Sequence, residues 1–303
     1  MTISSSPPVS GPGAAGAAPP KAGMGLGMWA AATGIFLFSW GPVFVRDNEF
    51  GALPFAFWRL FGAAMWAVAA LYLRGGRLDR RVLRHSLAGG LVFTVNAATF
   101  FTAIKTTAVA NAMVVGATAP IFLLWAASRV FQERISFRVV LATPIAVAGM
   151  ILMLVGRSGG SGDASLTGDV LAVVAMFAFA GYLVASRIAR NHLSALEYQA
   201  GWSTIAAGLM LPISLLSFDP LVIADGWSWG VAATMAVTAG LAHLLFNYSH
   251  RYVPMRALSL LNMAAPGLAV VWAWFLFDEQ IGGLQWLGIP LVVISVLAVV
   301  LDE

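Results

Sequence analysis

The 303-residue sequence contains no cysteine and few charged residues. Without cysteine, thiol catalysis, iron–sulfur clusters and structural disulfides are excluded. Charged residues make up 10% and hydrophobic residues 60% of the chain, whereas soluble domains carry roughly 25% charge. The mean hydropathy is +0.85. A soluble fold of this length could not bury so much apolar surface, so the expected solvent is lipid, and cytosolic enzymes and nucleic-acid binders are excluded.

Carboxylates are also missing from the middle of the apolar runs. All thirteen Asp and Glu residues lie in loops or within about a turn of the end of a run. Many carriers bind protons, Na⁺ or cationic drugs through a carboxylate near the membrane centre. Its absence argues against a cation/proton antiporter and favours a facilitator or exchanger. No nucleotide-binding motif is present, and we expect no catalytic residue, no metal and no cofactor.

The chain begins with a Ser/Pro/Gly/Ala-rich stretch at 1–26, which predicts a disordered cytoplasmic tail. Apolar runs and short polar loops alternate after it. Crossing ~30 Å of hydrocarbon takes a helix of ~20 residues, and backbone groups in lipid must be paired within the segment. The fold class we expect is therefore all-α and integral to the membrane, with ten transmembrane helices. The predicted spans are 27–45, 53–73, 86–104, 108–131, 138–156, 168–188, 196–217, 228–249, 257–277 and 284–301.

Lys and Arg residues fall mostly on one side of the predicted membrane. With the N-terminus inside, thirteen of the 17 lie in inner loops, and Arg46, Lys105 and Arg157 lie outside. Arg59 falls within the second span. This bias predicts that both termini are cytoplasmic (N-in/C-in), and it accounts for the basic composition without a nucleic-acid partner.

The two halves of the chain align with one another. At a shift of 146 residues the matches include Pro120 with Pro266, Glu133 with Glu279 and Pro144 with Pro290. At a shift of 141 residues Gly27 matches Gly168 and Arg46 matches Arg187. Five spans per half is an odd number, so the second repeat is expected to be inverted, as in carriers that work by alternating access. The predicted domains are the tail (1–26), a first five-helix repeat (27–156), a Gly/Ser linker (157–165) and a second five-helix repeat (166–303).

Four segments carry a resemblance to a known family. They are SWGPVFVR at 39–46, PFAFWRL at 54–60, the block 103–136 that contains TAPIF and FQERIS, and the block 257–282 that contains AAPGL and FDEQIG. Together these segments resemble the EamA-type drug/metabolite transporters. The resemblance implies a ten-helix inner-membrane carrier built from two inverted five-helix repeats. It also implies export of small metabolites, amino acids (including aromatic ones) and their relatives being the commonest cargo.

Polar side chains within spans are candidates for the substrate site. His243 and Asn247 lie one turn apart on one helix face, and Asn96 and Phe100 do so on another span. Each pair could line a central cavity, with His243 as a titratable gate or proton carrier. The alternative is that His243 and Asn96 only join helices through hydrogen bonds.

Two further asparagines precede prolines in their spans. Asn111 precedes Pro120, and Asn262 precedes Pro266. We interpret the prolines as hinges whose freed backbone carbonyls could bind an ammonium group. A kink that serves packing alone is the alternative.

Aromatic and basic residues complete the candidate set. Trp40, Tyr182, Trp202 and Trp272 lie away from most predicted membrane interfaces and could line a mostly apolar pocket, with lipid contact or packing as the alternative. Arg59 could bind a substrate carboxylate or snorkel toward the membrane surface. Arg46 and Lys105 are outer-edge cations, interpreted as gate or topology residues.

The sequence thus predicts a secondary carrier that exports amino acids or related metabolites across the inner membrane. A carrier of another metabolite, such as a nucleoside or a cofactor, and an intramembrane lipid-modifying enzyme are the alternatives, as is a channel. The expected partners are a small-molecule substrate and membrane lipid, with no nucleic acid, and the expected state is a monomer or weak homodimer.

Overall fold

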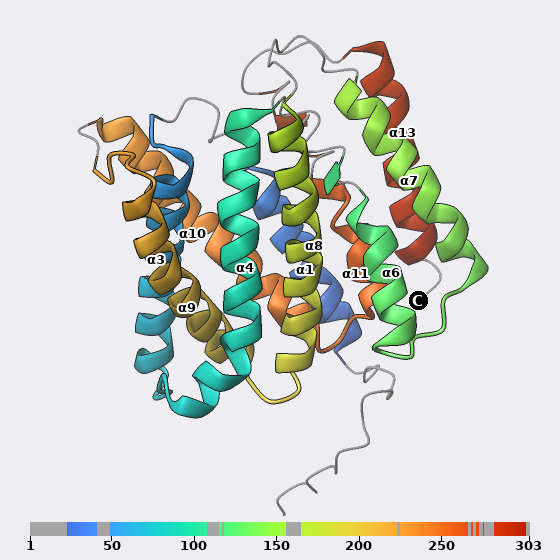
Figure 1. The fold of residues 1–303 in the computed structure, drawn as a ribbon. Coiled ribbons are helices and arrows are strands. Elements are labelled where there is room, and N and C mark those ends of the chain that lie inside the picture. Colours follow the sequence, from blue (N-terminus) through green and yellow to red (C-terminus); the bar gives the residue numbers. More distant parts are fainter. Residues whose placement is uncertain are drawn as a thin grey trace, which may run out of the picture.

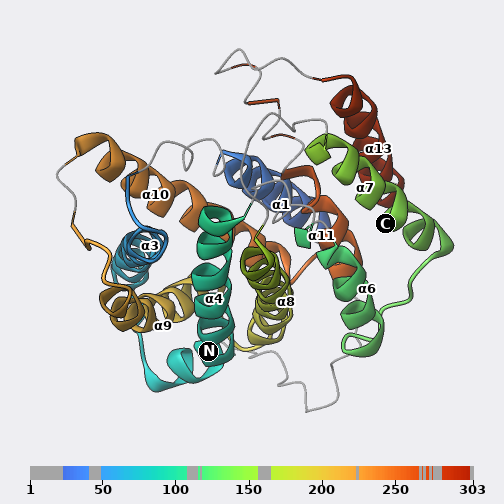
Figure 2. The same cartoon turned by 45° about the horizontal axis from the view of Figure 1, so that its top comes forward.

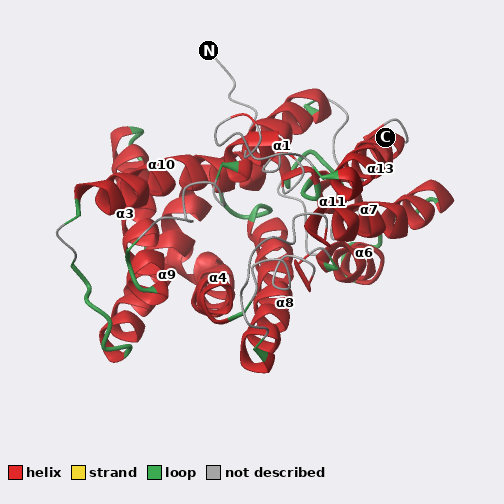
Figure 3. Cartoon of the chain, turned by 90° about the horizontal axis from the view of Figure 1, so that it is seen from above, coloured by secondary structure: helices red, strands yellow, loops and turns green. Residues whose placement is uncertain are grey.

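The computed structural model describes residues 23–40, 49–107, 115–116, 118–155, 165–222, 225–265, 268, 271–272, 275 and 282–300. These residues form helices and loops, and no strand occurs among them (Figure 3). The described helices are α1 (Met24–Ser39), α3 (Ala52–Leu73), α4 (Arg80–Thr106), α6 (Ala119–Arg129), α7 (Phe137–Val155), α8 (Leu166–Ala189), α9 (Ala195–Leu216), α10 (Gly226–Ser249), α11 (Met255–Leu261) and α13 (Gly283–Val300).

Each described helix overlaps one predicted span, in the same order along the chain. The all-helical class is therefore confirmed. Among the described residues, α3, α4, α8, α9 and α10 are each long and apolar enough to cross a membrane. The ten crossings, the N-in/C-in orientation and the inversion of the repeats stay predictions.

Capping residues define where several helices begin. Helix α4 starts six residues before the predicted span because the Asp79 carboxylate accepts a hydrogen bond from the backbone N–H of Val82 at 2.8 Å. Helix α9 begins with a capping box, in which Ser194 and Glu197 each accept from the other's backbone N–H. Polar caps extend these helices beyond their apolar stretches into the loops.

The helices pack side by side as a bundle, and different helices lie at its two ends (Figures 1 and 2). Helices α7 and α13 lie side by side at one end, and α3, α9 and α10 lie at the other, with α4 and α8 between. Helix α1 packs on α10, and α6 packs on α11 and α8. The interior is formed where α1, α3, α4, α8, α9 and α10 meet.

The contacts occur in equivalent pairs when one half is matched to the other. Under that match α1 corresponds to α8 and α4 to α10, so the contact of α1 with α10 is the counterpart of the contact of α4 with α8. Likewise α3 corresponds to α9, so the contact of α3 with α10 is the counterpart of that of α9 with α4. The pairing agrees with the alignment of the two halves.

Small residues allow the close approach of these helices. A Cβ atom built on Gly34 of α1 would lie 3.0 Å from the carbonyl oxygen of Ala242 in α10. One built on Gly90 of α4 would lie 2.6 Å from the Ile205 side chain in α9. Larger residues at either position would separate the helices that carry the central side chains.

Candidate functional site

A basic pair lies at the centre of the bundle. Arg59 of α3 and His243 of α10 approach with Nη2 3.5 Å from Nε2. A guanidinium has no acceptor, so the lone pair of His243 Nε2 must face it, and the ring proton then lies on Nδ1. The Arg59 guanidinium carbon also lies 5.5 Å from the Phe101 ring centroid. No carboxylate of the described residues is within ion-pair distance of Arg59.

Four aromatic rings surround His243. The ring centroids of Phe38, Phe93, Trp202 and Tyr182 lie 4.6, 4.9, 5.2 and 5.5 Å from that of His243. Each of the four rings is steeply inclined to the His243 ring, so the edge of one ring contacts the face of the other. They come from α1, α4, α9 and α8, so five helices including α10 meet here. We call these rings, with Arg59 and His243, the central cluster.

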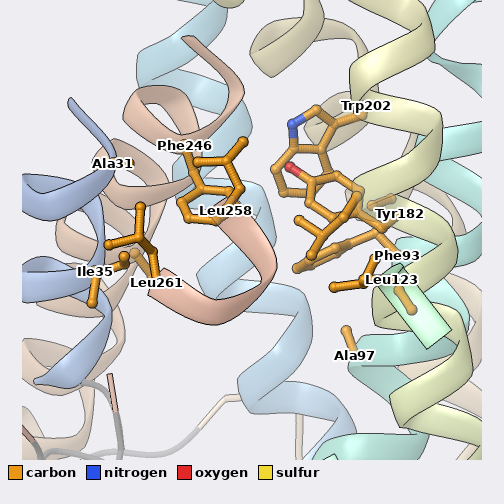
Figure 4. Packing of buried hydrophobic residues seen from close by; sticks show 14 of the residues in the cluster. Ala31, Ile35, Phe93, Ala97, Leu123, Tyr182, Trp202, Phe246, Leu258 and Leu261 are labelled. Atoms are coloured by element: carbon orange, nitrogen blue, oxygen red, sulfur yellow. The ribbon is translucent and has the colours of Figure 1, made fainter. Parts of the chain in front are cut away.

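The close-up view shows how the rings are arranged. Phe93, Tyr182 and Trp202 gather on one side, and Phe246 of α10 and Leu258 of α11 face them (Figure 4). All five side chains are buried. The surroundings of the basic pair are therefore apolar and aromatic, which suits a ligand with an apolar body.

A buried amide network fixes two of these rings. Asn247 Oδ1 accepts from the Tyr182 hydroxyl at 3.1 Å and from Ser186 Oγ at 2.7 Å. Asn247 Nδ2 donates to Gln199 Oε1 at 3.1 Å, and Trp202 Nε1 donates to the same oxygen at 3.2 Å. The Gln199 Nε2 group is buried and has no partner among the described residues. The network orients Tyr182 and Trp202 toward His243, and its one spare polar group is a donor.

A second aromatic group joins the end of α1 to the second half. The rings of Trp40 and Trp272 stack with centroids 4.3 Å apart. Trp272 Nε1 donates to Ser39 Oγ at 2.8 Å, and the Phe36 ring lies 5.3 Å from that of Trp272. This pair links α1 to a residue beyond α11.

Glu133, which lies just after the C-terminal end of α6, connects the two halves of the chain. Its carboxylate pairs with Arg187 Nη2 at 2.8 Å and accepts from the backbone N–H groups of Met255 at 2.9 Å and Arg256 at 3.1 Å. These two groups begin α11, where a negative charge is favoured. Arg187 also donates to the Val253 carbonyl at 3.0 Å. We call this set the Glu133 junction.

Two ionisable residues beside the junction are perturbed by burial. Burial, together with the nearby charge of Arg251, lowers the pKa of Arg190 to about 10. Burial, together with Arg187 and Arg190, lowers the pKa of His250 well below its usual value. Neither ring nitrogen of His250 has a hydrogen-bond partner among the described residues. His250 is therefore held neutral between two arginines.

Comparison with known proteins decides the family. A family model described as the EamA-like transporter family matches residues 25–155 and again residues 166–301. The chain belongs to the EamA-like transporter family. The resemblance drawn from the sequence is thereby confirmed, and the protein is a multi-pass membrane transporter.

Two relatives of this chain are each named as an uncharacterized transporter. An uncharacterized transporter of Archaeoglobus fulgidus is 29% identical over 258 residues, which cover 84% of this chain and 89% of that one. An uncharacterized transporter of Synechocystis sp. is 31% identical over 99 residues, 32% of this chain and 30% of the relative. A crystal structure superposes with a TM-score of 0.80 at 22% identity over 92% of this chain and 97% of that one, which supports the fold alone.

In this EamA-family transporter, five of the predicted site residues meet in one place. They are Arg59, Tyr182, Trp202, His243 and Asn247. The predicted pair Trp40 and Trp272 is in direct contact elsewhere.

Other predicted residues lie apart from the central cluster. Asn96 Nδ2 donates to the Ala175 carbonyl at 2.9 Å and so joins α4 to α8, while Phe100 packs against Phe101 at 5.6 Å. Lys105 is exposed in the last turn of α4, and Asn262 follows α11. Pro120 lies in the first turn of α6, a position that tolerates proline. Arg46, Asn111 and Pro266 lie outside the described residues.

Several contributing residues carried no signal of their own in the sequence. Phe38 and Phe93 are ordinary apolar residues of their spans, and Gln199 lies only five residues into α9. The Glu133 junction does have a signal in the sequence, because an acidic residue follows one predicted span and Arg187 lies at the end of another. Both residues also take part in the alignment of the two halves.

Proposed function

We propose that this transporter is a secondary carrier for small carboxylate-bearing metabolites, namely neutral or aromatic amino acids or their close relatives. It exports them across the inner membrane by alternating access of two inverted five-helix halves, with the central cluster as the substrate site. The observation that carries the proposal is Arg59, an interior cation without a carboxylate partner among the described residues, next to His243 and four aromatic rings.

Each part of the cluster has a role in this proposal. Arg59 binds the substrate carboxylate, because a guanidinium matches a carboxylate with two parallel hydrogen bonds. His243 holds the guanidinium in place while the site is empty, since it supplies an acceptor at 3.5 Å. Phe93, Tyr182 and Trp202 contact the apolar body of the substrate.

Alternating access is supported by the repeat and by the Glu133 junction. The alignment of the halves and their equivalent contact pairs favour two arrangements of similar energy, related by exchange of the halves. The Glu133 junction ties the first half to α8 and α11 of the second at one membrane face. Breaking this junction is a necessary step when that face opens.

The test is counterflow in proteoliposomes at equal pH and zero membrane potential. Vesicles loaded with one unlabelled compound from a panel of aromatic, branched and small amino acids and their deaminated analogues receive the labelled compound outside. We expect transient accumulation of label for at least one carboxylate of the panel. Arg59→Gln should abolish most of it, whereas Arg77→Gln, at an exposed loop arginine, should leave it unchanged. Failure of the whole panel to accumulate would contradict the proposal.

A further inference from the structure

Among the described helices, the only charged side chain away from the helix ends is a cation. Arg59 is the eighth residue of α3 and lies far from either end of that helix. Every other charged residue in a described helix lies within the first or last five residues, as do Arg84 in α4 and Asp169 in α8. Arg59 is half-buried, and a cation in a low-dielectric interior is costly unless an anion joins it, because much of its solvation by water is lost.

The hydrogen-bond donors of Arg59 are largely unused. Among the described residues its polar contact is the long one to His243 Nε2, at 3.5 Å. Its second contact is with the face of Phe101, which takes no N–H fork. A ligand with two acceptor oxygens in one plane satisfies the remaining donors.

The amide acceptors of the neighbouring network are, in contrast, already used. Asn247 Oδ1 accepts two hydrogen bonds, and Gln199 Oε1 also accepts two. The group left over is Gln199 Nε2, which is a donor. An incoming ligand therefore meets the donors of Arg59, and the two amide oxygens of this network, on Asn247 and Gln199, are not ready to accept from an ammonium group.

We propose that the substrate is a monoanion: a monocarboxylate without an ammonium group, such as a 2-oxo acid with a branched or aromatic body. The zwitterionic amino acid of the same skeleton is then the poorer substrate. Its ammonium would lie near the Arg59 guanidinium, where like charges repel and the described amide oxygens of Asn247 and Gln199 already accept two hydrogen bonds each. This inference rests on the proposed function and narrows its substrate class by charge.

The test compares matched pairs in the proteoliposome counterflow assay. Leucine is compared with 4-methyl-2-oxopentanoate, and phenylalanine with phenylpyruvate, at the same low external concentration. We expect the oxo acid of each pair to exchange about tenfold faster or more, since a charged ammonium group left without its hydrogen bonds weakens binding by at least about that factor. Because wild-type protein is used, this comparison does not depend on the folding of any variant.

Arg59 variants connect the selectivity to this residue. Arg59→Gln should lower oxo-acid exchange about tenfold or more and bring the two members of a pair close together. Arg59→Lys keeps the charge but loses the planar fork, so it should retain the preference with a lower rate. Arg77→Gln is the matched control, and size-exclusion profiles in detergent verify that each variant is folded.

The outcomes separate the two levels of the account. Amino acids that exchange as fast as their oxo acids would overturn the charge selection and leave the carrier standing. No exchange of either member of any pair would contradict the proposed function itself. An oxo-acid preference that Arg59→Gln leaves intact, in protein with a normal size-exclusion profile, would overturn the assignment to Arg59.

Discussion

Arg59 and His243 are 184 residues apart in the sequence, and their contact depends on how α3 and α10 are rotated about their axes. Both are polar residues inside predicted spans, and the sequence is compatible with two positions of the Arg59 side chain, snorkelling outward or facing inward. In the structure the guanidinium contacts His243 and Phe101 within the bundle. The sequence alone does not decide between these two positions, because the helices that surround the Arg59 side chain are known only from the fold.

Asn247 should matter more for stability than any one of its partners. Replacement by leucine leaves the buried hydroxyls of Tyr182 and Ser186 without their acceptor, at about 1–3 kcal/mol per unpaired group, and removes one of the two hydrogen bonds to Gln199 Oε1. Tyr182→Phe removes one donor and should cost about 1 kcal/mol. Thermal unfolding in detergent should therefore give a much lower Tm for Asn247→Leu than for Tyr182→Phe. Equal values would show that the network is already broken in the folded protein.

His250 should make the protein less stable in acid. Its pKa is lowered by burial beside Arg187 and Arg190, so the unfolded chain takes up a proton that the folded protein does not. Stability is then fully present above the ordinary histidine pKa of about 6.5 and is lost as the pH falls below it. Tm measured between pH 8 and pH 5 should decline below about 6.5. His250→Gln should flatten this decline, and His192→Gln, at an exposed histidine, should not.

At the scale of the elements, hydropathy located every described helix, because spans in lipid must be long, apolar and helical. Its boundaries were less accurate where polar caps decide, as at Asp79 before α4. The predicted span 108–131 is represented by α6, which begins at Ala119, and by the helical residues at 115–116. Asn96 shows the remaining limit: its hydrogen bond to Ala175 crosses between helices that only the folded chain brings together.

The Glu133 junction should control access to the start of α11. Glu133→Gln removes the ion pair with Arg187 and the charge at the α11 N-terminus, so this contact between the halves should open more often. The natural chain has no cysteine, so Ala257→Cys alone reports access to a buried position. We expect a maleimide to label it several-fold faster in Glu133→Gln.

The matched control is Glu197→Gln, which removes an acidic residue from the first turn of α9 and its 3.7 Å pair with Arg81. That pair is more exposed, and surface ion pairs contribute little. Equal labelling rates in the two variants would show that the Glu133 junction does not restrict opening.

In the molecule as a whole, the helix contacts agree with the repeat predicted from the sequence. Helix α1 packs on α10, and their counterparts in the other half, α8 and α4, also pack on one another. The placement of this bundle in the membrane depends on the charge of the loops. The loop before α4 holds Arg74 and Arg77, and the loop after α9 holds Asp219. The sequence therefore predicts opposite sides of the membrane for these two loops.

Single cysteines test that orientation directly. Phe218→Cys, in the exposed loop after α9, should react with a membrane-impermeant maleimide in intact cells. Arg77→Cys, in the exposed loop before α4, should react only after permeabilisation. The reverse pattern would contradict the N-in/C-in orientation, and labelling of both in intact cells would contradict the five spans, an odd number, predicted between the two loops.

The central claim is that Arg59 anchors the carboxylate of a transported substrate, and counterflow of a carboxylate panel measures this most directly. We expect transient, saturable accumulation of at least one carboxylate in wild-type proteoliposomes, and its loss in Arg59→Gln but not in Arg77→Gln. Accumulation that is unaffected by Arg59→Gln, or uptake no faster than in protein-free vesicles for every carboxylate, would contradict it.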